Sequence, residues 1–219
     1  MLSFTEENYL KAIYHLSNDG HQGVTTNMIA DHLSMRAASV TDMIKKLATK
    51  EVVKYEKYRG VNITPTGKRQ ALNIIRKHRL WEVFLVDKLK FQWDEVHDIA
   101  EELEHIKSDL LIKRLDEYLD YPRVDPHGDP IPDEHGELAI AKQVPLGEST
   151  LNQIAQVVAV DNSDAQFLKH LDRIGIYLGA KIKVLEVVEF DGSVEIEIDN
   201  RPAIYISKQT ADNILVTEK

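Results

Sequence analysis

The chain has 219 residues, a formal net charge of −9 and no cysteine, and it is 43% hydrophobic and 29% charged. This is the composition of a folded globular protein with room for one or two domains, and it argues against a disordered or fibrous chain. The lack of cysteine excludes disulfides, thiolate metal sites and cysteine nucleophiles. The sequence contains no long uncharged apolar run of the kind that a membrane span or a secretion signal requires. We therefore expect a cytoplasmic protein.

Positive charge is concentrated near the amino terminus. Residues 1–73 contain ten Lys or Arg against seven acidic residues, and residues 36–69 alone contain nine basic and three acidic residues. The rest of the chain therefore carries all of the net negative charge. A basic block of this kind is what a surface facing nucleic-acid phosphates requires.

The first elements predict a DNA-binding fold. Apolar residues at helical spacing predict helices over residues 5–16, 26–33 and 36–49, the first with Thr5 as N-cap. The last two, joined by a tight turn, are typical of a helix-turn-helix. From residue 52 to 63 the period changes to two around a polar turn, which predicts a β-hairpin. Together these elements predict a winged helix-turn-helix, with the second helix of the motif in the major groove.

A helical region follows the predicted wing. Thr64-Pro65 is a helix start, and apolar residues continue at helical spacing to Leu85. A second amphipathic helix is predicted from residue 94 to 119. The pair is too long and too apolar for a linker, so we expect a helical domain that forms a dimer.

The last part of the chain is predicted to be a linker and a small β domain. Four prolines between residues 121 and 136 indicate an extended linker. Alternating patterns then predict strands, with Asp191-Gly192 as a hairpin turn and a helix between the first two strands. The predicted strands are 154–160, 181–190, 194–198 and 203–206, and the predicted helix is 165–171. These elements predict a mostly β barrel of about 75 residues.

Candidate metal ligands gather on the two long helices. Within the second, four residues fall on one arc of about 100°. These residues are His97, Glu101, Glu104 and His105. The preceding helix offers His78 and Glu82 one turn apart. Six imidazole and carboxylate groups on adjacent helices can surround a divalent ion, although this spacing is also common on solvated helix faces.

Two other functional classes remain open on the residues alone. A metal-dependent hydrolase could be built on the helical pair, but no HExxH motif is present and no nucleophile stands out beyond the ligands themselves. A winged-helix regulator of a small organic ligand, with incidental histidines, is the other alternative.

The motifs as a set resemble the diphtheria-toxin-repressor family of metal-dependent transcriptional regulators, and within it the manganese transport regulators. The resemblance covers the whole chain in order, ending in a barrel similar to ferrous-transport A-type SH3-like domains. It rests on TEENYLKAIYHL, SMRAASVTDMIKKL, KYRGVNITPTGK, RKHRLWEVFL, VHDIAEELEHIKSD and PHGDPIP.

The resemblance implies a primary, activating metal site and an ancillary site. The primary site would comprise Asn8, Glu101, Glu104 and His105, and the ancillary site His78, Glu82 and His97. Glu101 stands where iron-responsive members have cysteine, so the primary site offers only oxygen and imidazole donors. Such hard donors suit Mn²⁺ first and Fe²⁺ as the alternative, with selectivity set by coordination number and geometry.

Two positions on the first helix depart from the manganese regulators. Asn8 stands where those proteins have aspartate, and Lys11 replaces a further acid found in some of them. An amide can ligate only through a neutral carbonyl oxygen, so the primary site carries less negative charge. Asn8 is therefore either a ligand or a plain amide on the helix surface.

The linker offers a second arrangement of the ancillary site. Asp125 and His127 lie where some manganese-responsive members recruit ligands, and Glu82 would be shared. The alternative for this segment is a plain turn.

The barrel has three candidate roles, namely ligand donor, dimer stabiliser and binding site for a Pro-rich peptide such as the linker. Gln166 matches an ancillary ligand of the family, but Ser163 stands where the accompanying glutamate would be. Asp161 or Asp164 are candidate substitutes for that missing acid.

For DNA, the resemblance points to the recognition helix and the wing. Base-facing and flanking positions are Arg36, Ala38, Ser39, Thr41 and Asp42, and phosphate contacts are Lys45, Lys46 and Arg59. A solvated basic face is the alternative, which the hairpin that follows disfavours.

The sequence thus predicts a mainly α protein with α+β parts. Its predicted domains are a winged helix-turn-helix (1–73), a helical metal-binding and dimerisation domain (74–120), a linker (121–143) and an SH3-like domain (144–219). We expect a homodimeric, non-enzymatic repressor that binds a palindromic operator in double-stranded DNA when Mn²⁺ or Fe²⁺ is bound, that controls metal-uptake genes, and that has no membrane partner.

Overall fold

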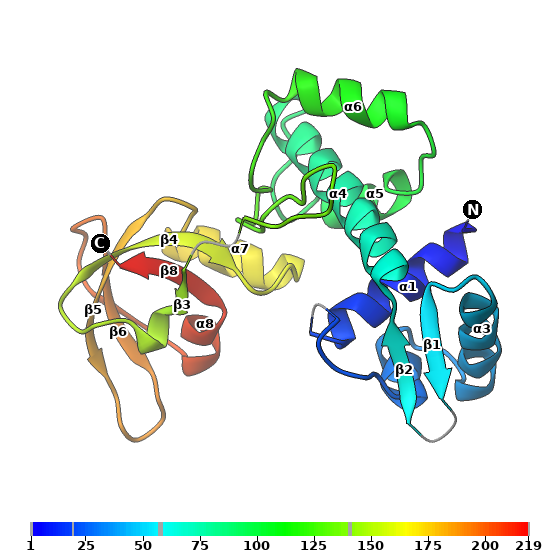
Figure 1. Ribbon diagram of the computed structural model, residues 1–219. Helices are drawn as coiled ribbons and strands as arrows, with labels where there is room; N and C mark the ends of the chain where they lie inside the picture. Colours follow the sequence, from blue (N-terminus) through cyan, green and yellow to red (C-terminus); the bar gives the residue numbers. More distant parts are fainter. Residues whose placement is uncertain (1, 19, 57–58, 140–141, 219) are drawn as a thin grey trace. The chain divides into compact units, whose positions relative to one another are not determined.

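A computed structural model describes residues 2–18, 20–56, 59–139 and 142–218 (Figure 1). The chain divides into two compact units. The first comprises Met1–His78, Glu101–Ile112 and Pro132–Leu138, and the second Arg79–Ala100, Lys113–Ile131 and Ala139–Lys219. The predicted fold class is confirmed, with a winged helix-turn-helix first, a helical region next and an antiparallel SH3-like sheet last. No helix among the described residues is long and apolar enough to cross a membrane.

The first helix begins earlier than predicted. Helix α1 (Phe4–Leu16) has Ser3, and not Thr5, as its N-cap. The Ser3 side chain accepts a hydrogen bond from the Glu6 backbone N–H, while the Glu6 carboxylate accepts one from the Ser3 N–H at 2.7 Å. This capping box satisfies two N–H groups that the helix itself leaves unpaired. It also fixes Glu6, Glu7 and Asn8 on the first turns of α1.

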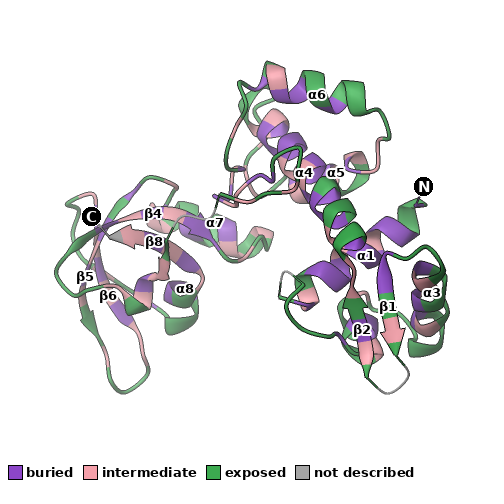
Figure 2. Cartoon of the chain, in the orientation of Figure 1, coloured by how far each residue is buried: buried purple, intermediate pink, exposed green. Residues whose placement is uncertain are grey.

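The winged helix-turn-helix is confirmed. It consists of α1, α2 (Thr26–His32), α3 (Ala37–Thr49), β1 (Val53–Glu56) and β2 (Gly60–Ile63). The two strands pair antiparallel, from Val53 opposite Ile63 to Glu56 opposite Gly60. Buried residues at helical spacing, including Leu10, Ile13, Ile44 and Leu47, form the core. Most of the α3 surface stays exposed (Figure 2). Residues 57 and 58 of the predicted turn lie outside the described residues.

A long helix continues from the wing. Helix α4 (Pro65–Asp87) starts at the predicted Pro65. Its first turn packs closely against the residue that precedes β1, since a Cβ on Gly67 would lie 1.9 Å from the Val52 carbonyl oxygen. Only glycine fits at that position.

The second long helix is a correction, because residues 94–119 do not form one helix. Helix α5 (His97–Leu103) ends at Leu103, and α6 (Asp109–Tyr118) starts after Ser108. The hydroxyl of Ser108 accepts a hydrogen bond from the Leu111 N–H at 3.2 Å, as an N-cap does. Glu104 and His105 therefore lie in the turn after α5, and the arc argument does not apply to them.

The last region is an antiparallel sheet with short helices. Its elements are β3 (Val144–Pro145), η1 (Leu146–Glu148), β4 (Ile154–Val160), α7 (Ala165–Ile174), β5 (Lys181–Val187), β6 (Val194–Ile198), β7 (Ile204–Ile206), α8 (Lys208–Asp212) and β8 (Ile214–Glu218). The strand order is β3-β8-β4-β5-β6-β7. Alternating buried residues on β4, β5, β6 and β8 form a core of their own, as the period of two predicted.

Candidate metal centre and DNA interface

The turn after α5 places a buried carboxylate between side chains of α1 and α4. Glu104 is fully buried. Its Oε2 accepts a hydrogen bond from His78 Nδ1 at 2.6 Å, and Lys11 Nζ lies 2.7 Å from Oε1 and 2.9 Å from Oε2. Lys11 Nζ also donates to Glu101 Oε1 at 3.2 Å. We call the group comprising Glu7, Asn8, Lys11, His78, Glu101, Glu104 and His105 the helix cluster.

The charge of Glu104 is maintained by its partners. Burial alone would raise the pKa of Glu104, but the hydrogen bond from His78 and the positive charge of Lys11 hold its pKa below the ordinary value of 4.5. The group is therefore a carboxylate at neutral pH.

Besides Glu104 Oε1, whose contact with Lys11 is an ion pair, two potential ligand atoms of the helix cluster make no hydrogen bond among the described residues. These are Asn8 Oδ1 and His105 Nε2, and both atoms are buried. The other nitrogen of His105, Nδ1, lies 2.6 Å from Glu7 Oε2, which orients the ring. Unpaired buried polar atoms are uncommon, since each costs free energy. Together with the carboxylates, they fit the donor set of a hard divalent cation.

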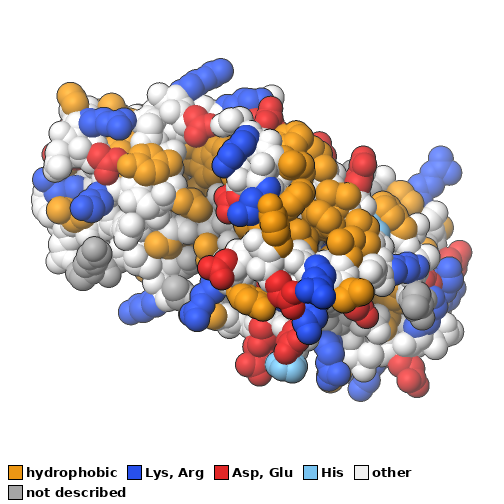
Figure 3. Space-filling view, turned by 90° about the horizontal axis from the view of Figure 1, so that it is seen from above, with side chains coloured by type: hydrophobic (Ala, Val, Ile, Leu, Met, Phe, Trp, Pro, Cys, Tyr) orange, Lys and Arg blue, Asp and Glu red, His pale blue; other side chains and the backbone are white. Residues whose placement is uncertain are grey.

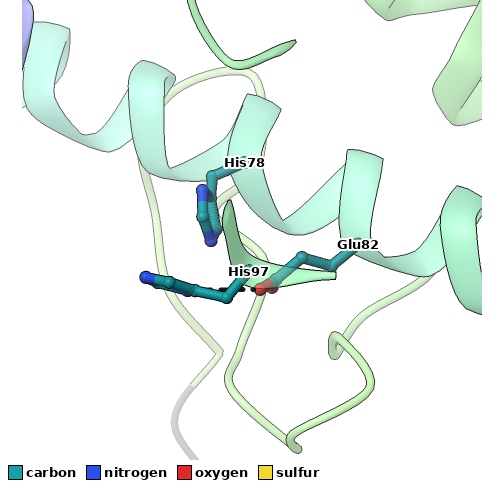
Figure 4. Close-up of side chains that lie close together, drawn as sticks. All are labelled: His78, Glu82 and His97. Atoms are coloured by element: carbon teal, nitrogen blue, oxygen red, sulfur yellow. Dashed lines mark ion pairs between the residues drawn. The ribbon is translucent and has the colours of Figure 1, made fainter. Parts of the chain in front are cut away.

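Figure 4 draws the three residues of the predicted ancillary site, of which Glu82 and His97 belong to the same compact unit. His78 and Glu82 occupy successive turns of α4, and His97 Nδ1 lies 3.7 Å from Glu82 Oε1. His78 is not confined to this set, because its Nδ1 is already bonded to Glu104. His78 therefore contacts a residue of the predicted primary site, which spacing alone did not indicate.

A second group forms around the linker. Glu82, Asp125 and His127 are all buried and each offers a ligand atom within 4.8 Å of the others. His127 Nδ1 lies 3.7 Å from Glu82 Oε1 and 4.0 Å from Asp125 Oδ1. We call these three residues the linker cluster.

The linker cluster is built by a tight turn. Asp125 Oδ1 accepts hydrogen bonds from the His127 N–H at 2.8 Å and the Asp129 N–H at 3.0 Å. Gly128 has a φ of +90°. The ring of His127 stacks on Trp93, and its Nε2 lies 2.9 Å from the Trp93 carbonyl oxygen. That carbonyl accepts a hydrogen bond from the Nε2–H, which leaves Nδ1 turned toward the two carboxylates.

Burial and neighbouring charges shift the pKa values of the linker cluster. Burial, the charge of Glu82 and that of Asp129 raise the pKa of Asp125 to about 7, although Arg79 opposes them. Burial alone would lower the pKa of His127, but its hydrogen bond to Glu82 and the charge of Glu82 raise it. Arg79 reaches Asp125 at 3.4 Å and Asp129 at 3.1 Å. Burial and like charge thus disfavour the ionised form of Asp125, which a bound cation would favour.

The barrel residues considered as ligands have different surroundings. Asp164 is the N-cap of α7, and its Oδ1 accepts hydrogen bonds from the backbone N–H groups of Gln166 and Phe167. Asp161 follows Val160, whose N–H donates to the His127 carbonyl oxygen at 2.9 Å. Burial and the charge of Asp129 raise the pKa of Asp161. Of the two acids, Asp161 is thus the one near the linker. Gln166 and Ser163 are exposed.

The predicted DNA-contact residues belong to the first unit and are mostly exposed. Arg36, Ala38, Ser39, Asp42, Lys45, Lys46 and Arg59 are exposed, and Thr41 is half-buried. Arg36 is the N-cap of α3, and its side chain makes no capping bond. The first N–H groups of α3 can therefore donate hydrogen bonds to a phosphate. Thr41 Oγ1 donates to the Ala37 carbonyl oxygen at 2.9 Å. These positions are consistent with a helix presented to the major groove.

The charged members of this face have partners within the protein. Lys45 pairs with Asp42 and Arg59 with Glu56, each at 3.3 Å. These exposed pairs are weak and open readily.

Lys46 pairs with buried Glu6 at 3.3 Å, and Lys50 pairs with Glu6 at 2.7 Å. Burial alone would raise the pKa of Glu6, but hydrogen bonds from Lys50, Ser3 and Lys46 lower it to about 2. Glu6 therefore attaches the end of α3 to α1.

Sequence reasoning missed several residues of these sites. It did not assign a role to Glu7, Arg79 or Trp93, and it noted Lys11 only as a departure from related proteins. A signal existed for two of them, because Glu7 and Lys11 lie four residues apart on the face of α1 that carries Asn8. No local signal marks Arg79 or Trp93, whose contacts depend on the tertiary fold.

Comparisons with known proteins cover the whole chain. Residues 1–61 match the family "Iron dependent repressor, N-terminal DNA binding domain", residues 64–133 match "Iron dependent repressor, metal binding and dimerisation domain", and residues 144–218 match the FeoA domain. The diphtheria toxin repressor of Corynebacterium glutamicum is 30% identical over 220 residues, which cover 93% of this chain and 96% of that protein.

Solved structures agree. A manganese-dependent transcriptional repressor in complex with manganese is similar with a TM-score of 0.87 and 35% identity, over 98% of this chain and 100% of the other. The manganese regulator SloR is similar with a TM-score of 0.76 and 34% identity, over 98% of each chain.

Proposed function

Since this chain belongs to the diphtheria toxin repressor family and is a metal-sensing, DNA-binding repressor, we propose that Mn²⁺ is its co-repressor, with Fe²⁺ as the alternative ion. The proposed targets are metal-uptake genes. We propose that the protein acts without catalysis, as a homodimer on a palindromic operator, in the cytoplasm where that DNA lies.

The proposed division of labour follows the chain. Residues 1–73 read the operator, residues 74–120 hold the metal and dimerise, residues 121–143 link, and residues 144–219 form the SH3-like domain.

The donor set of the helix cluster carries this proposal. Asn8 Oδ1 and His105 Nε2 are buried and make no hydrogen bond among the described residues, and His105 Nε2 lies 3.7 Å from Glu104 Oε1, whose partner Lys11 also contacts Glu101. Oxygen and imidazole donors without a thiolate suit Mn²⁺ or Fe²⁺. The primary ligands would be Asn8, Glu101, Glu104 and His105, and we add His78 because its ring touches Glu104.

The ligands come from separate elements, and this is the proposed basis of regulation. Asn8 is on α1 of the reading head, whereas Glu101 and Glu104 belong to α5 and the turn after it. When bound, the cation supplies positive charge that neutralises the carboxylates and a common point of attachment for both elements. The ion pairs of Glu6 with Lys46 and Lys50 then couple the position of α3 to that of α1. A 100-fold change in operator affinity corresponds to about 2.7 kcal/mol of coupling.

The proposed DNA contacts are those that the resemblance implied. Arg36, Ala38, Ser39, Thr41 and Asp42 would face or flank the bases, and Lys45, Lys46 and Arg59 would contact phosphates. Exposure of this face and the uncapped start of α3 support the assignment. Lys46 would exchange its pair with Glu6 for a phosphate.

An exposed apolar face supports a homodimer. Seen from above, hydrophobic side chains gather over α6 (Figure 3). Among them are Leu110 (67% exposed), Leu111 (41%) and Tyr118 (64%). Large apolar side chains exposed together mark an interaction surface. In such a dimer, two recognition helices would address half-sites about one helical turn apart, roughly 34 to 36 Å.

The linker cluster is the proposed ancillary site. Glu82, Asp125 and His127 form it, and His97 is an alternative partner of Glu82. Gln166 stays a proposed ligand from the barrel, while Asp161 lies nearer to the linker.

A titration of operator affinity tests the proposal. Full-length protein would select duplexes from a random pool in parallel with Mn²⁺ and with EDTA, and affinity would then be measured against Mn²⁺, Fe²⁺, Co²⁺ and Zn²⁺. We expect binding to require a metal and to weaken strongly in Glu101→Ala. Glu102→Ala, which removes an exposed carboxylate one position along α5, is the matched control.

Other outcomes would favour the alternatives. Operator binding that survives EDTA unchanged would favour a regulator of an organic ligand. Turnover of ester substrates that requires Glu104 would favour a hydrolase.

A further inference from the structure

A lysine side chain occupies the centre of the proposed primary ligand set. The ammonium of Lys11 lies 2.7 Å and 2.9 Å from the two oxygens of Glu104 and 3.2 Å from Glu101 Oε1. Its side chain is only 15% exposed, so these contacts are shielded from water. Both carboxylates proposed to bind the ion are thus already bound to a cation that belongs to the chain.

The two kinds of cation exclude each other at this position. A divalent ion bound to Glu104 would lie within a few ångströms of the ammonium, and like charges at that distance repel strongly where water is scarce. Neither Glu104 oxygen is free of Lys11 in this structure. The carboxylates therefore cannot serve both cations at once.

We propose that Lys11 is a built-in competitor for the primary site: its ammonium neutralises Glu101 and Glu104 in the metal-free protein and must leave before a divalent ion can bind. This inference rests on the proposed function, since it assigns the residue that sets the metal concentration at which the repressor switches.

The structure gives the ammonium a way out. Glu101, the outer of its two partners, has a side chain that is 50% exposed, so the cluster opens to solvent on that side. Lysine carries its charge on four flexible methylene groups, which can turn outward without movement of α1. The polar atoms Asn8 Oδ1 and His105 Nε2 stay behind, buried and without hydrogen-bond partners among the described residues.

Lys11 raises the metal concentration needed for activation but does not change the order of the metal affinities. Removal of Lys11 from the carboxylates requires the same free energy whichever ion follows, so every ion loses affinity by the same factor. The concentration needed for activation by an abundant but weakly bound ion such as Mg²⁺ then lies above the concentration at which that ion is present. Ions that use all of the oxygen and imidazole donors still bind.

Charge removal at position 11 tests the inference. In full-length Lys11→Met, whose side chain has a similar length but no charge, we expect the dissociation constant of Mn²⁺ at the helix cluster to fall at least about tenfold, since hydrogen bonds to charged groups contribute that much or more to an equilibrium constant. Lys11→Arg keeps the charge and should stay within about threefold of the parent chain. Calorimetry with MnCl₂ in the parent chain and in a His127→Ala background, which weakens the linker cluster, identifies the binding event of the helix cluster.

The inference is overturned if Lys11→Met binds Mn²⁺ equally or more weakly. A wild-type chain that shows no metal-dependent operator binding, combined with the expected shift in Lys11→Met, would instead reject the proposed function and keep the competitor.

A second measurement needs no variant and serves if Lys11→Met does not fold. Acylation of lysines by an amine-reactive ester, followed by peptide mass spectrometry, reports how accessible each ammonium is. MnCl₂ should increase the reactivity of Lys11 severalfold and leave exposed Lys90, on the loop after α4, unchanged. Equal or greater protection of Lys11 in the presence of Mn²⁺ would contradict its displacement.

Discussion

The helix cluster and the linker cluster contain similar side chains but balance their charge in opposite ways. In the helix cluster, Lys11 and His78 hold the pKa of Glu104 below its ordinary value. In the linker cluster, burial and neighbouring carboxylates raise the pKa of Asp125 to about 7. In the helix cluster the cations of the chain outweigh the effect of burial on the pKa, whereas in the linker cluster burial and like charges outweigh Arg79.

The difference predicts which group binds a divalent ion more readily. In the helix cluster an incoming cation replaces an existing ion pair, so its net gain is reduced. In the linker cluster it relieves repulsion between Glu82 and Asp125. We therefore expect the linker cluster to fill at lower metal concentration and the helix cluster to act as the switch.

The largest effect is expected from Glu104→Gln. This change leaves Lys11 and His78 beside a neutral amide in a buried site, and breaking such a pair should lower the free energy of unfolding by about 3 kcal/mol. It also removes the central ligand, so Mn²⁺-dependent operator binding should weaken at least about 100-fold. Urea unfolding and operator titration measure the two effects.

Glu102→Gln is the matched control for this change, because Glu102 is exposed and lies two residues before Glu104. If Glu104→Gln kept its metal response, the helix cluster would not be the switch, and the contrast between the two clusters would lose its functional meaning.

Gly128→Ala should destabilise the linker cluster itself. Gly128 has a φ of +90°, and a Cβ there would lie 2.0 Å from the Val158 carbonyl oxygen. Backbone strain and this clash should together lower the free energy of unfolding by about 3 kcal/mol. Calorimetric unfolding measures the loss, and Gly147→Ala, whose Cβ would meet only ordinary contacts at 3.7 Å, is the control. An undiminished stability would mean that the turn is not fixed in solution.

The sequence predicted the elements that carry strong local patterns. The winged helix-turn-helix followed from apolar spacing and from the change to a period of two at residue 52, and both are properties of neighbouring residues. The break between α5 and α6 was missed because apolar residues continue at helical spacing across Ser108, whose hydroxyl nevertheless starts a new helix.

The candidate ligands could be named from the sequence only through resemblance, and their partners could not. Lys11 and Glu104 are 93 residues apart, so their ion pair depends on the packing of α1 against the turn after α5. The same holds for Arg79, which is on α4 but neutralises Asp125 and Asp129 in the linker. Which acid receives a cation is decided by the tertiary fold, and this choice separates the two clusters.

His127→Ala sharpens the predicted order of filling. The change removes the imidazole of the linker cluster, so the tighter of two Mn²⁺ binding events should weaken about 10- to 100-fold, as loss of one ligand typically does. His135→Ala removes an exposed linker histidine and should leave both events unchanged. Calorimetric titration with MnCl₂ separates the events. Loss of the weaker event instead would reverse the proposed order.

The smallest effect is expected for Asp199, a carboxylate that hydrogen bonds hold outside both clusters. In the barrel, Asp199 accepts hydrogen bonds from the Lys181 N–H at 3.0 Å and the Tyr177 hydroxyl at 2.9 Å, and these bonds lower its pKa below 3.8. Because the pKa is lower in the folded state than in the unfolded state, the stability from this group is present above pH 3.8 and is lost as the pH falls through the folded value.

Asp199→Ala should therefore lower the melting temperature by only about 2 °C at pH 7, and the difference from the parent chain should shrink below about pH 4. Glu189→Ala, an exposed barrel acid, is the control. Mn²⁺ binding and its dependence on Lys11 should be unchanged, because neutral donors hold this carboxylate and no metal competes for it. If the difference in melting temperature persisted undiminished at low pH, Asp199 would act through packing. Its hydrogen bonds would then not be what holds this carboxylate ionised.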